Sequence, residues 1–369
     1  MIEVYEDYLS LFLNDVPLLD VRAPVEFREG AFPQSINLPL LDDEQRKAIG
    51  IRYKEAGKEA AIALGWEMAS PQILESRLQA WSGFCHQHPE GLLYCWRGGL
   101  RSKTSQSLIK KAGFDLPLVK GGYKALRNFL LQQFDTCLAQ LTCVLLSGPT
   151  GSGKTRLLHR LDHAIDLEGM AAHRGSAFGA TLQEQPSQIN WENSLYIQLL
   201  KHLHHRGISE PVIIEDEARL IGRIHVPFPM QDKMKIAPKI ILTVPMEERV
   251  ALIRQDYVEE GLKNYMMIYG EKGFTFFSDY ILGNLDRIKK RLGGVRYQNL
   301  QQLFARALTM LQEDRDSSGF DAGIASLLTD YYDPMYEYML TKRQGPILFE
   351  GNADAIVSWL ENFKVNQSA

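Results

Sequence analysis

Hydrophobic and polar residues along the first third of the chain follow the pattern of short strands separated by helices. Apolar runs that end in polar turns predict strands, over residues 16–22, 35–40 and 91–96. Stretches rich in Ala, Lys and Glu predict helices over 42–64 and 102–112, and the first of these is interrupted at Gly50 and Gly57. Strands that alternate with helices indicate a parallel sheet with helices on both faces.

The same alternation starts again in the second part of the chain. A strand, a Gly-Gly turn and a helix over 118–134 close the first part. New strands are predicted over 144–147, 211–216 and 239–245, with a helix from Lys154. From Glu247 onward, long amphipathic helical patterns dominate. We therefore predict two α/β domains, residues 1–135 and residues 141–369, the second with a helical C-terminal region.

Composition and charge narrow the class of protein. The 369 residues are 45% apolar and 23% charged, as in globular proteins. A formal charge of −4 does not by itself indicate a nucleic-acid-binding surface, although it can conceal a local basic patch. No apolar run reaches the length of a membrane span, and the first twenty residues lack the basic start of a signal peptide. We expect a soluble cytoplasmic protein without a membrane partner.

Residues 148–155, Gly-Pro-Thr-Gly-Ser-Gly-Lys-Thr, match the P-loop pattern G-x-x-x-x-G-K-[ST] between a predicted strand and a predicted helix. Glycines let successive backbone N–H groups face one anion, and the helix N-terminus adds partial positive charge. We expect phosphate binding by Gly148, Gly151, Ser152, Gly153, Lys154 and Thr155. This geometry recognises a diphosphate and is indifferent to the group attached to it.

A P-loop is usually accompanied by an acidic residue at the end of a neighbouring strand, which holds a metal ion or its water. Glu215, Asp216 and Glu217 follow an apolar run. Among these three we choose Asp216, together with the Thr155 hydroxyl, as ligands of Mg²⁺, and we expect no organic prosthetic group. The alternative interpretation is a solvated acidic turn.

A polar, glycine-containing loop over 166–179 includes Glu168, His173 and Arg174. Its composition suits the binding of an anionic substrate beside the P-loop, and Arg174 is the candidate phosphate ligand. The alternative is an ordinary surface loop.

Cys95 stands between an apolar strand and a loop that contains Arg97 and Arg101 and leads into a helix. A loop at a helix N-terminus directs N–H groups inward, and two arginines add charge, so the thiolate is favoured. We expect Cys95, Arg97 and Arg101 to be catalytic, in thiol-transfer rather than acyl-transfer chemistry, since no neighbouring His or Asn suggests a protease-like relay. The remaining cysteines are expected in the core, at positions 85, 137 and 143.

The first domain resembles the rhodanese family in its segments LLDVR, EFREGAFPQSINLPL, CWRGGLRS and VKGGYKALR. It departs from that family at Ala31, where histidine is frequent. Together with the P-loop and the segments DLEGMAAHRGSAFG, QPSQINWEN and EDEARLIGRIHVP, the chain is similar to the tRNA 2-selenouridine synthase family over nearly its whole length. Ala218 stands where that family is expected to have serine.

This resemblance implies a rhodanese-like parallel-sheet domain followed by a P-loop NTPase-like α/β domain. It also implies replacement of sulfur by selenium in the wobble 2-thiouridine of tRNA, with selenophosphate as selenium donor. An S-geranylated intermediate formed from geranyl diphosphate is implied as well, and an enzyme that makes selenophosphate is a candidate partner. In this scheme the P-loop holds the diphosphate of the geranyl donor and Cys95 serves the selenium step.

Two other functions remain open from the sequence. One is an ATP-dependent tRNA sulfurtransferase that uses the same cysteine loop and P-loop. The other is a sulfur carrier or regulatory P-loop ATPase, in which the cysteine passes persulfide to a partner protein. Basic clusters that could contact RNA lie at 202–206, 233–239 and 287–296, and each could equally be a solvated helix face.

Overall fold

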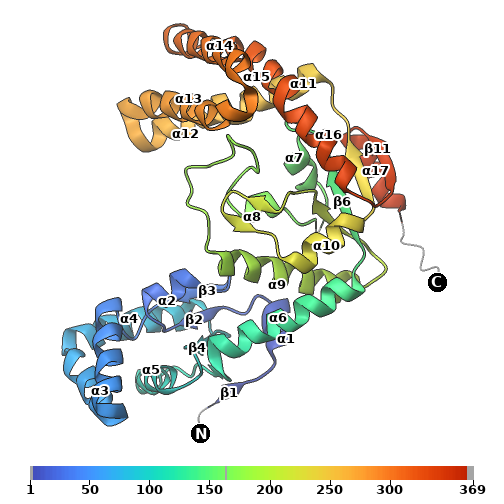
Figure 1. The fold of residues 1–369 in the computed structure, drawn as a ribbon. Coiled ribbons are helices and arrows are strands. Elements are labelled where there is room, and N and C mark those ends of the chain that lie inside the picture. The colour runs from blue at the N-terminus through green and yellow to red at the C-terminus, as the bar shows by residue number, and fades with distance from the viewer. Residues whose placement is uncertain (1–2, 163, 364–369) are drawn as a thin grey trace. The chain divides into compact units, whose positions relative to one another are not determined.

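The computed structural model describes residues 3–162 and 164–363. The described chain forms two compact units. The first unit lies within Met1–Ala139 and Pro186–His205, and the second lies within Gln140–Gln185 and Arg206–Ala369. Each unit has its own sheet, as the sequence predicted (Figure 1).

The first unit is built on a parallel sheet with the strand order β1-β5-β4-β2-β3. Its strands are β1 (Val4–Tyr5), β2 (Leu18–Asp20), β3 (Ser35–Asn37), β4 (Leu92–Tyr94) and β5 (Leu118–Val119). Its helices in the N-terminal part are α1 (Tyr8–Leu13), α2 (Pro24–Glu29), α3 (Asp43–Met68), α4 (Pro71–Gln87), α5 (Leu100–Lys111) and α6 (Gly122–Gln140). The predicted strands around residues 18, 35 and 92 are therefore confirmed. Strands β2 and β4 are buried throughout, as expected for a covered parallel sheet.

The core of this unit joins the sheet to α4 and α5. Leu19, Leu93 and Leu118 of the strands pack with Trp81 of α4 and Ile109 of α5. Complete burial of one such side chain stabilises the fold by about 1.5–3 kcal/mol. This packing holds β4 firmly, and the cysteine loop starts at the end of β4.

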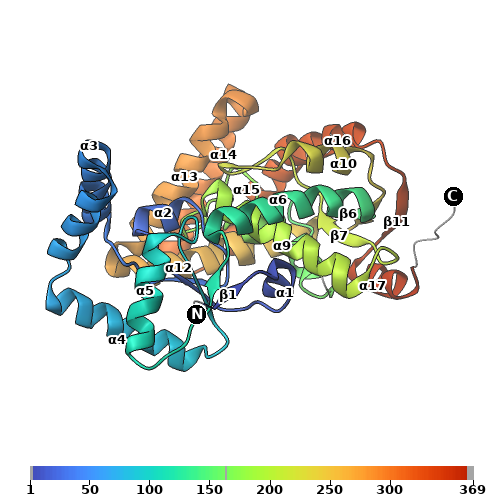
Figure 2. The same cartoon turned by 90° about the horizontal axis from the view of Figure 1, so that it is seen from below.

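Helix α3 runs through Gly50 without a break and kinks at Gly57, where φ is 80° and ψ is −175° (Figure 2). The predicted interruption at Gly57 is thus confirmed, and the one at Gly50 is wrong. A positive φ is accessible to glycine at little steric cost, whereas a glycine with helical dihedrals lowers helix stability without ending the helix.

Helix α9 (Gln188–Arg206) follows the P-loop in sequence but belongs to the first unit. The Ala31 N–H donates to Asn190 Oδ1 at 2.6 Å, and Asn193 Nδ2 donates to the Ala31 carbonyl at 2.7 Å. Arg127 of α6 donates to Asn193 Oδ1 at 2.7 Å, and Trp191 is fully buried. The predicted domain of residues 141–369 therefore includes a helix that belongs to the first unit. A division of the chain at a single point cannot describe this arrangement.

The second unit contains a parallel sheet with the strand order β11-β10-β6-β7. Its strands are β6 (Cys143–Ser147), β7 (Val212–Glu215), β10 (Lys239–Leu242) and β11 (Ile347–Gly351), and β8 (Leu220–Ile221) pairs with β9 (Ile224–His225) in an antiparallel hairpin. Strands β6, β7 and β10 confirm the predictions. The expectation of helical patterns from residue 247 onward missed β11, which returns to pair with β10.

The remaining helices of the second unit surround this sheet or extend from it (Figures 1 and 2). They are α7 (Lys154–Leu158), α8 (Leu167–Met170), α10 (Phe228–Ile236), α11 (Met246–Ile253), α12 (Glu260–Tyr269), α13 (Gly273–Leu292), α14 (Gly294–Glu313), α15 (Asp321–Leu327), α16 (Asp333–Lys342) and α17 (Ala353–Asn362). Phe277, Leu300, Phe304 and Phe320 form part of a separate apolar core among α12 to α15. This confirms the predicted helical C-terminal region.

Over residues 3–162 and 164–363, none of the helices combines the length and the apolar character that a membrane span requires.

Candidate active site

The P-loop connects β6 to α7 in the second unit. Gly151 and Gly153 have φ values of 79° and 80°, which residues with a Cβ rarely adopt. A Cβ on Gly148 would lie 2.8 Å from Ser152 Oγ and 3.1 Å from the Leu242 carbonyl, so the loop passes closely over β10. Lys154 Nζ donates to the Gly148 carbonyl at 3.0 Å. The predicted phosphate ligands within residues 148–155 therefore lie on one continuous segment that leads from buried β6 into α7.

Arg249 of α11 braces this turn from outside the motif. Its Nε and Nη2 donate to the Thr150 carbonyl at 3.0 and 2.9 Å, and its Nη1 donates to Asp333 Oδ2 of α16 at 3.0 Å. The arginine is buried. Sequence analysis missed both residues, because an arginine on an amphipathic helix carries no signal that it contacts a distant loop.

A cavity of about 1220 Å³ opens at the P-loop, within the second unit. One part of its lining is polar and includes the P-loop and the 166–179 segment. Another part is apolar or aromatic, with side chains from α11 to α16, including Leu252, Ile253, Met267, Ile268, Met335 and Met339. The cavity therefore suits a ligand that has both a phosphorylated end and an apolar part.

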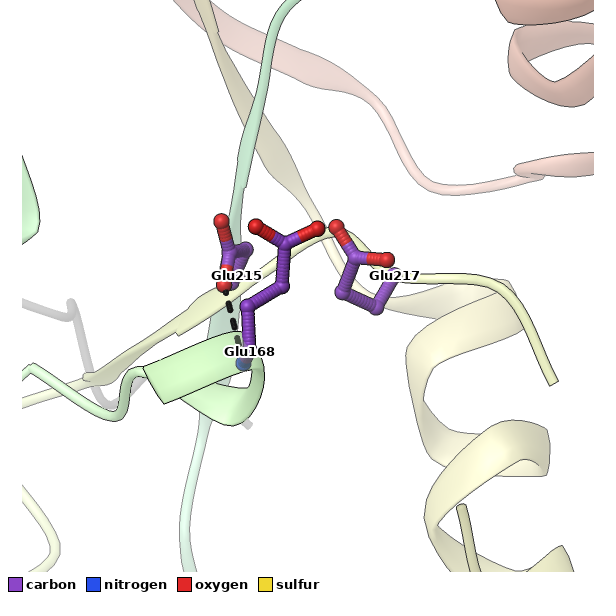
Figure 3. Close-up of side chains that lie close together, drawn as sticks. All are labelled: Glu168, Glu215 and Glu217. Carbon is purple, nitrogen blue, oxygen red and sulfur yellow. Dashed lines mark hydrogen bonds between the residues drawn. The ribbon is translucent and has the colours of Figure 1, made fainter. Parts of the chain in front are cut away.

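Three carboxylates gather in the same cavity (Figure 3). Ligand oxygens of Glu168, Glu215 and Glu217 lie within 4.8 Å of one another. Glu168 belongs to α8, Glu215 ends β7, and Glu217 follows two residues later. Glu215 is fully buried, and its Oε2 accepts from the Glu168 N–H at 3.3 Å. The fold thus brings α8 and the end of β7, which are distant in sequence, to the same edge of the sheet.

Burial and mutual repulsion perturb these carboxyl groups. Burial, followed by the charges of Glu217 and Glu215, raises the pKa of Glu168 to about 10. Burial also raises the pKa values of Glu215 and Glu217, and Lys154 opposes the rise in both. Carboxylates in such surroundings accept a proton or a cation readily.

Asp216 occupies a different position from the three glutamates. Its Oδ2 accepts from Ser147 at 2.6 Å, and its Oδ1 accepts from Arg343 Nε at 2.7 Å. The structure therefore gives the predicted metal ligand two protein partners. Thr155 lies in the first turn of α7 and lines the cavity.

Arg174 lines the same cavity, as expected of a candidate phosphate ligand. Its Nη1 donates to the Asp256 carbonyl at 2.9 Å, and its guanidinium lies over the Tyr257 ring, 4.8 Å from the ring centroid. The side chain is exposed. Stacking on the tyrosine orients the guanidinium and leaves N–H donors for an anion.

Cys95 lies in the first unit, where β4 passes into α5. The residue is 3% exposed, and its thiol donates to Ser102 Oγ at 3.2 Å. The Tyr123 N–H donates to the Cys95 carbonyl at 2.9 Å, and a Cβ on Gly122 would overlap that carbonyl. The Gly-Gly turn is therefore required for the close approach of the two segments. The other cysteines are buried, as predicted, at positions 85, 137 and 143.

The two arginines of the cysteine loop have different surroundings. Arg101 is bound to Glu26, with Nη1 and Nη2 donating at 2.5 and 3.1 Å. Burial opposes the charged form of Arg101, but the hydrogen bonds and charge of Glu26 raise its pKa, and the charge of Cys95 adds to that rise. Arg97 is exposed. Arg101 is thus a fixed charge beside the sulfur, and Arg97 is available to a ligand.

Comparisons with known proteins cover both units. The model of the tRNA 2-selenouridine synthase AAA domain matches residues 141–367, and that of the rhodanese-like domain matches residues 6–128. The tRNA 2-selenouridine synthase of Marinobacter nauticus is 50% identical and covers 96% of each chain. The corresponding proteins of Alcanivorax borkumensis (48% identical, 96% of this chain and 98% of theirs) and Sulfurovum sp. (41% identical, 97% and 98%) are similar over the same extent.

Proposed function

Because the chain belongs to the tRNA 2-selenouridine synthase family, we propose that it replaces the sulfur of the wobble 2-thiouridine of tRNA by selenium through an S-geranylated intermediate. Geranyl diphosphate supplies the geranyl group and selenophosphate supplies the selenium. The activity named for the relatives supports the overall conversion. The two-step route is supported by the cavity of the second unit and the cysteine loop of the first.

In the first step the thiouridine sulfur forms a bond to C1 of the geranyl group, and the bond from C1 to the diphosphate oxygen breaks. Negative charge grows on the departing diphosphate. The N–H groups of the P-loop and Lys154 are placed to stabilise that charge, and Arg174 adds a guanidinium at the same cavity. Preorganised donors of this kind act in the transition state because they need no rearrangement.

The observation that carries this proposal is the continuation of the phosphate site into an apolar wall. Met267 and Ile268 of α12 and Met335 and Met339 of α16 line the cavity that contains the P-loop. Met267 is 77% exposed and Ile268 is 54% exposed, so apolar surface beside the phosphate site is available to a ligand. Flexible methionines adapt to an irregular apolar chain.

In the second step the selenium of selenophosphate bonds to C2 of the base, the C2–S bond breaks, and the sulfur takes up a proton and departs as geranylthiol. Water then cleaves the P–Se bond and phosphate is released. Alkylation of the sulfur makes C2 more electrophilic and makes the sulfur a better leaving group. Cys95 serves this step by positioning the selenium donor, because selenide-level selenium cannot form a bond to the thiol without an oxidant. Arg97 is free to hold the phosphoryl group of selenophosphate, and Arg101 positions the cysteine loop through Glu26.

Mass spectrometry of nucleosides from 2-thiouridine tRNA tests whether Cys95 serves selenation and Lys154 serves geranylation. With geranyl diphosphate and selenophosphate, the wild-type protein is expected to form 2-selenouridine. Cys95→Ser is expected to accumulate S-geranyl-2-thiouridine and to lose selenation by at least a hundredfold. Lys154→Ala is expected to lose both products by at least tenfold, because the diphosphate is no longer stabilised as it departs.

Matched controls are Cys85→Ser, at another buried cysteine, and Lys111→Ala, at an exposed lysine of α5 outside the candidate basic clusters. Both should retain both products. Loss of geranylation in Cys95→Ser would contradict the separation of the two steps. Thiolation that requires ATP, without selenouridine, would instead favour a tRNA sulfurtransferase, and the absence of every product would favour a sulfur carrier.

A further inference from the structure

One oxygen of the glutamate cluster lacks the partner that a buried carboxylate normally has. Glu215 is fully buried, yet its Oε1 has no hydrogen-bond partner among the described residues. Figure 3 shows the carboxyl groups of Glu168 and Glu217 turned toward each other, with the Glu215 carboxyl beside them. A buried, unpaired carboxylate oxygen is unfavourable, and a cation bound at this edge of the sheet would offset that cost.

We propose that Glu168, Glu215 and Glu217 hold a divalent cation of the Mg²⁺ or Mn²⁺ type at the P-loop cavity. All three residues line the cavity, and their ligand oxygens lie within 4.8 Å of one another. An octahedral ion with ligands at about 2.1 Å places its ligand oxygens roughly 3–4 Å apart. Oxygen-only ligands favour hard cations over zinc or copper.

Gly175 supplies an independent indication that this space is shaped for carboxylates. Its φ is +51°, and a Cβ there would overlap Glu168 Oε1 and lie 2.9 Å from Glu217 Oε2. The 166–179 loop thus passes directly over the two carboxyl groups and excludes any side chain between itself and them. A cation beneath this loop would offset the repulsion that the close approach of the carboxylates creates.

Two ligand assignments can be distinguished. The sequence favoured Asp216, but its two oxygens are engaged by Ser147 and Arg343. Within the described part of the chain, no arginine forms an ion pair with the three glutamates, and the charge of Lys154 lowers the pKa of each of them. When bound, the ion would supply positive charge at the diphosphate end of the cavity. The role of the ion at the diphosphate rests on the proposed function. The binding of the cation does not.

Titration of the full-length, metal-free protein with Mn²⁺, followed by electron paramagnetic resonance, tests the site without tRNA or geranyl diphosphate. The wild-type protein should bind one ion at the cavity, and Glu168→Gln and Glu217→Gln should each weaken that binding at least tenfold. Glu248→Gln, on the exposed face of α11, is the matched control and should not change it. At the same concentration, Mg²⁺ should raise the Tm of wild type more than the Tm of either variant.

The Tm of each variant without metal shows whether that variant loses Mn²⁺ binding only because it misfolds. Glu168→Gln should be at least as stable as wild type, because it removes one of three clustered acids. Equal Mn²⁺ affinity in wild type, Glu168→Gln and Glu217→Gln overturns the proposal, and so does a loss of affinity confined to Asp216→Asn. Intact Mn²⁺ binding with no geranylation would refute the proposed reaction and leave the cation site standing.

Discussion

In the cysteine loop, Cys95 and Arg101 are each hydrogen-bonded to a partner side chain. Arg101 was expected to be a catalytic charge, and the structure places it on Glu26, 2.5 Å from the nearer carboxylate oxygen. Burial would raise the pKa of Glu26, but the hydrogen bonds and charge of Arg101 outweigh it and lower the pKa. The pair therefore fixes the start of α5, where Cys95 Sγ is bound to Ser102.

Replacement of Glu26 by Gln should destabilise the first unit by about 2 kcal/mol at pH 7, since Arg101 loses a partly buried partner. A carboxyl group with a lowered pKa in the folded state contributes stability above its unfolded pKa of about 4.3. That contribution disappears as the pH falls through the lower folded value.

Urea unfolding at several pH values measures this effect. The difference between wild type and Glu26→Gln should shrink as the pH falls below about 4.3 and through the lowered folded pKa of Glu26. Asp115→Asn, at an exposed ion pair with Lys110, is the control and should change stability by less than about 1 kcal/mol. A Glu26→Gln deficit that stayed constant with pH would show that lost packing, and not the ion pair, causes it.

At the level of elements, the P-loop turn depends on two helices that lie far from it in sequence. Arg249 of α11 binds the Thr150 carbonyl and is paired in turn with Asp333 at the start of α16. The glycine conformations at 151 and 153 were predictable from the motif. The contact of Arg249 with this turn was not predictable from the sequence, because it depends on how α11 and α16 pack.

Arg249→Met should reduce the free energy of unfolding by about 3 kcal/mol, because it leaves Asp333 and the Thr150 carbonyl without a partner. It should also weaken the binding of inorganic pyrophosphate at least fivefold, since the turn loses its outer support. Denaturant unfolding and isothermal titration measure the two effects. Arg160→Met, at an exposed ion pair with Asp354, should have neither effect. Unchanged pyrophosphate binding in Arg249→Met would mean that the turn holds its shape unaided.

At the scale of the whole molecule, the first unit includes a helix from the second half of the chain. Helix α9 is bound through Asn190 and Asn193 to the backbone of Ala31, the position at which the chain departs from the common rhodanese pattern. The QPSQINWEN segment, which carried part of the family resemblance, therefore has a structural role in the first unit.

Asn193→Ala should lower the stability of the first unit by about 1–3 kcal/mol, because the Ala31 carbonyl and Arg127 lose a buried partner. Hydrogen exchange followed by mass spectrometry should show faster exchange in β2 and β4, with β6 and β10 unchanged. Ser194→Ala on the same helix should leave both sheets as in wild type. Equal acceleration in both sheets would show that α9 stabilises the two units together.

The sequence by itself determined the parallel α/β sheets, the P-loop and the position of Cys95 between a strand and a helix. These features depend on local signals, namely apolar runs, helix formers and a glycine pattern that the backbone requires at fixed spacing. Strand β11 was not predictable in this way, because a short strand far along the chain pairs with β10 only when the helical region has folded back. The cluster of Glu168 with Glu215 and Glu217 and the brace from Arg249 depend likewise on neighbours that the sheet and helices bring together. Only the tertiary structure decided them, since contact between distant segments is a property of packing.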